Sequence, residues 1–154
     1  MNTKRNYIIF GIMILVSTAA MYAMMFFNVF QLSHVHWSQT RFFMALMMGA
    51  GMAIIMLAFM WKMYKNKVAN IVILCVSIAV FAASLFMVRS QTGVGDTAWM
   101  RAMIPHHSIA ILTSERADLT DPEVRELAEE IIESQRSEIA QMEDLIERLE
   151  TTAE

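Results

Sequence analysis

The residues best suited to chemistry are two adjacent histidines and two methionines in the second half of the chain. Met100, Met103, His106 and His107 lie within the run MRAMIPHH. On a helix, Met100, Met103 and His107 share one face and His106 lies on its flank. Thioethers and imidazoles together favour a soft cation, so cuprous copper is the first candidate. Zinc is less favoured because it gains little from methionine.

A second helix is expected opposite this one. The sequence DLTDP places Asp121 as an N-cap before Pro122, which predicts a helix from Pro122 to about Leu149. Because the connection is short, this helix should lie antiparallel to a first helix that Asp96 caps and that runs to about Ala117. Its apolar residues recur at steps of four and three, and the predicted buried stripe is Ala128, Ile132, Gln135, Ile139, Met142, Ile146 and Leu149. The corresponding stripe on the first helix is Asp96, Met100, Met103, His107, Ala110, Ser114 and Ala117.

Two polar residues of the second helix lie where apolar ones are expected. Gln135 falls in the stripe, and Glu138 falls on its flank. A buried polar group without a partner costs about 1–3 kcal/mol, so both need partners. Closing the hairpin brings them and Met142 opposite the histidines. The predicted metal ligands are Met100, Met103, His106, His107, Glu138 and Met142, with Gln135 and Asp96 as possible additions.

Other readings of these residues stay open. One inward carboxylate is too few for a di-iron site. The histidine pair could equally form a structural polar layer in a helical interface. We find no nucleophile–base pair, phosphate loop or paired carboxylates at a cleft, so an enzyme is not predicted.

The first part of the chain has the composition of membrane-spanning helices. Residues 1–88 contain no acidic residue, and uncharged runs at about 7–30, 42–61 and 68–88 are each long enough to cross a bilayer as a helix. The first run is too long for a cleaved signal peptide, so we expect a retained anchor. Small residues recur every four positions and predict close helix packing: Ala45, Gly49 and Ala53, then Cys75, Ala79 and Ala83.

The basic residues predict the orientation of these helices. Lys4 and Arg5 precede the first span, and three lysines lie between the second and third. By the positive-inside rule these segments are cytoplasmic, so the N-terminus is inside and the C-terminal region is outside the cytoplasmic membrane. His34 and His36, in the outer loop 31–41, then lie on the same side as the other two histidines. They could join a metal site, although a solvated interfacial pair is favoured.

The second part of the chain is acidic and polar. A linker at 89–95 leads to the hairpin at 96–150 and a tail at 151–154. From Arg89 onward there are six arginines and fifteen acidic residues, a formal charge of −9, which argues against a nucleic-acid partner. The single cysteine, Cys75, excludes an intrachain disulfide.

The strings MRAMIPHHSIAI from Met100 and QRSEIAQM from Gln135 resemble the domain of unknown function 305 family. The resemblance covers about Asp96–Leu149. It implies a ferritin-like helical fold built from two-helix repeats, and it implies copper binding and copper tolerance, as in some periplasmic members. It implicates the same six ligands. Here there is one repeat, and two helices bury too little area to be stable alone, so we expect a homodimer that completes a four-helix bundle. The overall expectation is an all-α, membrane-anchored copper protein, with a structural or protein-interaction module as the alternative.

Overall fold

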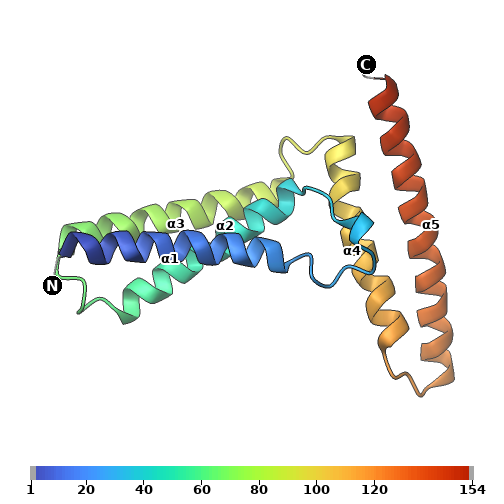
Figure 1. Ribbon diagram of the computed structural model, residues 1–154, viewed down its shortest axis with the longest axis horizontal. Coiled ribbons are helices and arrows are strands. Elements are labelled where there is room, and N and C mark those ends of the chain that lie inside the picture. The colour runs from blue at the N-terminus through green and yellow to red at the C-terminus, as the bar shows by residue number, and fades with distance from the viewer. Residues whose placement is uncertain (1–2, 153–154) are drawn as a thin grey trace. The chain divides into compact units, whose positions relative to one another are not determined.

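The computed structural model describes residues 3–152, and its regular elements are helices. They are α1 (Thr3–Met24), the 3-10 helix η1 (Leu32–His34), α2 (Gln39–Phe59), α3 (Lys67–Ser90), α4 (Asp96–Arg116) and α5 (Pro122–Thr152) (Figure 1). The predicted all-α class is confirmed. Of the expected tail, residues 151–152 continue α5 and residues 153–154 lie outside the described residues.

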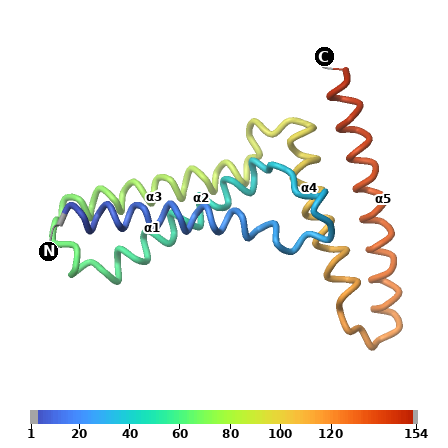
Figure 2. Tube along the Cα trace, viewed as in Figure 1, coloured from blue at the N-terminus to red at the C-terminus, as the bar shows by residue number. Residues whose placement is uncertain are grey.

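The chain forms two compact units. The first contains residues 3–25 and Thr40–Thr92, and therefore holds α1, α2 and α3. The second contains Phe26–Gln39 together with residues 93–152, and therefore holds η1, α4 and α5. The segment Phe26–Gln39 thus belongs to the hairpin's unit, although it connects two helices of the other unit along the chain (Figure 2).

The first unit carries three helices long and apolar enough to cross a membrane, as predicted. They span Lys4–Met24, Gln39–Phe59 and Lys67–Ser90. The first helix stops at Met24, short of the expected end near residue 30. At that point the Arg41 guanidinium donates a hydrogen bond to the carbonyl oxygen of Met25. It therefore satisfies an acceptor that the end of a helix leaves free.

The small-residue stripe predicted on α2 is buried. Ala45 is 2% exposed, Ala53 is 5% exposed and Gly49 is also buried. A Cβ atom added to Gly49 would lie 2.1 Å from the Thr18 hydroxyl oxygen of α1. Glycine is therefore required for the close approach of α1 and α2 at this position.

The stripe predicted on α3 was wrong. Cys75, Ala79 and Ala83 are exposed. The buried positions of α3 are instead polar and recur every seven residues: Asn70, Ser77 and Ser84. Polar side chains face inward because hydrocarbon offers them no hydrogen-bond partner.

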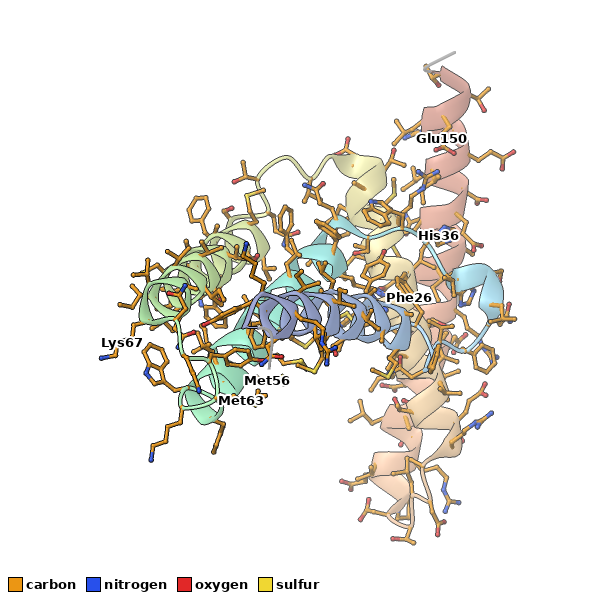
Figure 3. All side chains as sticks on the ribbon, turned by 60° about the vertical axis from the view of Figure 1, so that its left-hand side comes forward. Phe26, His36, Met56, Met63, Lys67 and Glu150 are labelled. Carbon is orange, nitrogen blue, oxygen red and sulfur yellow. The ribbon has the colours of Figure 1, made fainter. Side chains whose placement is uncertain are left out.

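Asn70 shows what this inward orientation provides. The Tyr7 hydroxyl donates to Asn70 Oδ1 (2.7 Å), and Asn70 Nδ2 donates to the Tyr64 carbonyl oxygen (2.8 Å). The bonds tie α1 and the α2–α3 connection to the start of α3. Figure 3 labels Met63, which lies in this connection, and Lys67, which is the first residue of α3.

The hairpin forms in the second unit with local signals close to those expected. Asp121 Oδ1 accepts from the backbone N–H groups of Glu123 (2.9 Å) and Val124 (3.1 Å), so the predicted N-cap of α5 is confirmed. The N-cap of α4 is Gly95 rather than Asp96, which is the first helical residue. Asp96 still suits that position because a carboxylate interacts favourably with the N-terminal end of the helix dipole.

Candidate functional site

The seam between α4 and α5 contains both apolar and sulfur-bearing side chains. Its buried core is Met100, Ile104, Ile111, Ile139, Met142 and Ile146. The stripe predicted on α5 agrees with this core. The stripe predicted on α4 does not, because the burial continues through Ile104 and Ile111 instead of Ala110, Ser114 and Ala117. The apolar residues of α4 decide its rotation about its own axis because burying them is worth more than burying alanine and serine.

His107 lies at the edge of this seam and joins the two helices. Its Nδ1 atom lies 3.0 Å from the carbonyl oxygen of Met103, one turn earlier on α4. Its Nε2 atom lies 2.7 Å from Glu138 Oε2 on α5. Both partners are acceptors, so each of these hydrogen bonds needs a proton on the imidazole nitrogen that makes it. The His107 side chain is 11% exposed and that of Glu138 is 48% exposed.

Glu138 is also held from its own helix. The Ser134 hydroxyl donates to Glu138 Oε1 at 2.8 Å, so each carboxylate oxygen accepts a hydrogen bond. The bond from Ser134 and then that from His107 lower the pKa of Glu138 below its ordinary value of 4.5. The carboxylate is therefore ionised at neutral pH, and the partner that Glu138 was expected to need is His107.

The thioethers predicted as ligands gather in the seam. Met100 is 4% exposed and Met142 is 6% exposed, and Met103 packs against the same core while partly buried. The carbonyl oxygen of Met103 is the one that orients His107. Three thioethers therefore share one cluster in the seam, and the imidazole at its edge has one nitrogen held by a carbonyl. Thioethers and imidazoles are donor types that cuprous copper prefers.

His106 points away from the seam. It is exposed, and the centroid of its ring lies 6.1 Å from that of His107 with 65° between the ring planes. Neighbouring residues on a helix point about 100° apart, so both histidines cannot face α5. Of the possible additions, Gln135 is partly buried on α5 and Asp96 is exposed at the start of α4.

The expected solvated pair in the outer loop was wrong for His34, which is only 7% exposed. Its Nδ1 atom lies 2.9 Å from the hydroxyl oxygen of Ser108, which also accepts the backbone N–H of Phe30 (2.6 Å). Ser108 is completely buried. It fixes the loop to α4, a role that the sequence does not reveal because a single serine after two histidines carries no distinguishing signal.

His36 is half-buried in the same unit and is labelled in Figure 3. Its Nε2 atom is buried without a hydrogen-bond partner. Burial, followed by the nearby Arg101 guanidinium, lowers the pKa of His36 below 6.5, and Glu143 opposes the shift. The neutral form of the ring is therefore the one that this position favours.

Within residues 3–152, no three His, Cys, Asp or Glu side chains are grouped closely enough to hold a metal ion. His107 and Glu138 are the one imidazole–carboxylate ion pair that the structure gives among these residues.

These features define the class: an all-α protein with three helices fit to cross a membrane and a helical hairpin joined by a histidine–glutamate pair. The chain belongs to the family described as "Domain of unknown function (DUF305)", whose model matches residues 87–152. It is also similar to "Uncharacterized protein L153" of Acanthamoeba polyphaga mimivirus, with 31% identity over 108 residues, 69% of each chain. This alignment is longer than the family match, so it includes residues outside it. No solved structure matches the chain.

Proposed function

We propose that this protein binds copper through its hairpin at the outer face of the cytoplasmic membrane, and thereby contributes to copper tolerance. The observation that carries the proposal is the setting of His107. A histidine that ligates a metal with one nitrogen commonly donates its other N–H to a backbone carbonyl, and the bond from His107 Nδ1 to Met103 has this form. Nε2 is then the ligating atom.

The residues that would hold the ion are His107, Glu138 and the thioethers of Met100, Met103 and Met142. His107 Nε2 and Glu138 Oε2 share one proton in a hydrogen bond of 2.7 Å. A cation would take the place of that proton. Copper supplies a soft centre that thioethers prefer, and the chain supplies orientation through the Met103 carbonyl and through Ser134. His106, which is exposed, is an outer ligand at most.

The arrangement of charges supports the proposed location. The lysines at the α2–α3 connection and before α1 favour the cytoplasmic side, which leaves the hairpin and Phe26–Gln39 outside. An acidic domain on that side also attracts cations from the surroundings.

A second function is a structural or protein-interaction module. The specific observation in its favour is that the polar atoms of this pair all have protein partners: His107 bonds to the Met103 carbonyl and to Glu138, and Glu138 also accepts from Ser134. In that case the pair is a polar layer that fixes the register of α4 and α5.

The two functions are separated by titrating the full chain in detergent with cuprous ion against a competing chelator. Met142→Leu and Met103→Leu keep the side-chain volume nearly unchanged but remove a sulfur, so packing is largely retained. Copper binding predicts that each weakens cuprous affinity while thermal stability stays close to that of the original chain. A polar layer predicts no binding by the original chain, and this result would refute the copper proposal.

His107→Ala is the second variant, and His106→Ala is its matched control on the neighbouring position. We expect His107→Ala to lose copper binding and His106→Ala to retain most of it. Equal losses in both variants would contradict the assignment of His107 as the ligand that the seam orients.

A further inference from the structure

The hairpin has two lateral faces, and one of them is already covered by the chain itself. Phe30 packs against the seam core, and the Arg136 guanidinium lies 5.7 Å from the centre of its ring. His34 and Phe30 also line a pocket of about 420 Å³ together with Ile139 and Glu143 of α5. The segment Phe26–Gln39 therefore occupies the face that carries Arg136 and Glu143.

The other face lies on the opposite side of the buried stripe of α5. Ile131, Glu138 and Leu145 recur there every seven residues, with Leu127 one turn before Ile131. Leu127 is 55% exposed and Ile131 is 37% exposed, whereas Leu145 is partly buried. We call this the uncovered face, and its members are Met103 and His107 of α4 and Leu127, Ile131, Glu138 and Leu145 of α5.

The uncovered face carries far fewer acidic residues than the rest of α5. α5 contains ten acidic residues between Glu123 and Glu150, yet the uncovered face includes only Glu138, which is paired with His107. Two copies of this hairpin repel each other over most of α5. They can approach through the uncovered face. There the His107–Glu138 pair lies between apolar side chains that precede and follow it along α5.

The metal ligands on this face are also incomplete in one chain. His107 and Glu138 provide one imidazole and one carboxylate, and within residues 3–152 no third His, Cys, Asp or Glu side chain is placed to hold a metal ion with them. Glu138 is half exposed on the uncovered face, so its carboxylate is accessible to a partner. In a two-fold interface the residues close to the axis meet their own counterparts, so an interface centred on this pair brings a second pair to the first.

We propose that a second copy of this chain docks on the uncovered face, and that the two His107–Glu138 pairs jointly hold one copper ion. The inference rests on the proposed copper function and adds to it the partner and the stoichiometry. Membrane anchoring favours this assembly, because copies confined to one bilayer in the same orientation meet at a raised effective concentration.

The test uses the full chain in detergent and measures two quantities: molar mass by light scattering, and copper per chain after equilibration with cuprous ion and a chelator. Ile131→Glu places a charge on the uncovered face. Ser137→Glu is the matched control, because Ser137 is exposed on α5 and lies on the side away from the seam. Helical content by circular dichroism checks that both variants fold.

We expect the original chain and Ser137→Glu to be dimers with one copper ion per two chains. Ile131→Glu should be monomeric, with cuprous affinity lower by roughly 100-fold, the low end of what joining two half-sites provides. One copper ion per chain, unchanged in a monomeric Ile131→Glu, would overturn the shared site and leave the copper function standing. A dimer that binds no copper would overturn both. A copper-binding monomer of the original chain would overturn this inference alone.

Discussion

Replacing Ser108 by alanine tests how the outer loop is held on the hairpin. The substitution removes one oxygen atom that is completely buried and that bonds both the Phe30 N–H (2.6 Å) and His34 Nδ1 (2.9 Å). His34 is itself buried, so it has little access to water as a substitute partner. A buried group left without its hydrogen bond costs about 1–3 kcal/mol. We therefore expect the docked state of Phe26–Gln39 to be destabilised by about 1–3 kcal/mol relative to its opened state.

Hydrogen–deuterium exchange of the full chain in detergent measures this quantity directly. Since 1.4 kcal/mol corresponds to a factor of ten, backbone amides of residues 26–39 should exchange about 5- to 140-fold faster in Ser108→Ala. The N–H of His34, which bonds to the Gln31 carbonyl oxygen at 3.1 Å, should be among them. Ser137→Ala makes the same chemical change at an exposed position of α5 and should leave this segment unchanged. Exchange of the segment at the original rate in Ser108→Ala would refute the assignment of Ser108 as its anchor.

Three further outcomes follow from local geometry. Asp121→Ala removes the acceptor of two N–H groups at the start of α5, so the hairpin should lose about 1 kcal/mol, seen as faster amide exchange in the first turn of that helix alone. Gly49→Ala should lower the free energy of unfolding of the full chain in detergent by about 1–3 kcal/mol, because the added Cβ would collide with the Thr18 hydroxyl. Gly51→Ala should be tolerated, because its added Cβ would lie 3.8 Å from the nearest atom, on the Phe81 ring. Equal effects of the two substitutions would contradict the predicted contact. The stability that Glu138 contributes is present above its ordinary pKa of 4.5 and is lost as the pH falls through its lowered pKa in the folded chain. Ser134→Ala should raise that pKa toward 4.5, so the loss of stability is smaller and is complete at a higher pH. A carboxyl titration followed by carbon NMR that shows no change in the pKa would exclude the hydrogen bond.

The sequence by itself determined the elements of this protein. Three uncharged runs of about twenty residues have to be helices in a bilayer, because hydrocarbon cannot satisfy their backbone groups. Asp121 followed by Pro122 fixed the start of α5 through bonds within a few residues, and the buried stripe of α5 followed from its own periodicity. The pairing of His107 with a groove that contains Glu138 also followed, since both helices repeat their side chains at known angles.

Only the tertiary structure decided which faces of these helices meet and what covers them. α3 turns Asn70, Ser77 and Ser84 inward, where Asn70 bonds to Tyr7, and leaves its small residues exposed. α4 turns Ile104 and Ile111 inward instead of its alanines. Which face of each helix is buried depends on contacts with residues distant in the sequence. The spacing of residues along one helix does not reveal how much the free energy of burying one face differs from that of burying another. The outer loop is the clearest case, because its position rests on a single buried hydroxyl 74 residues from His34.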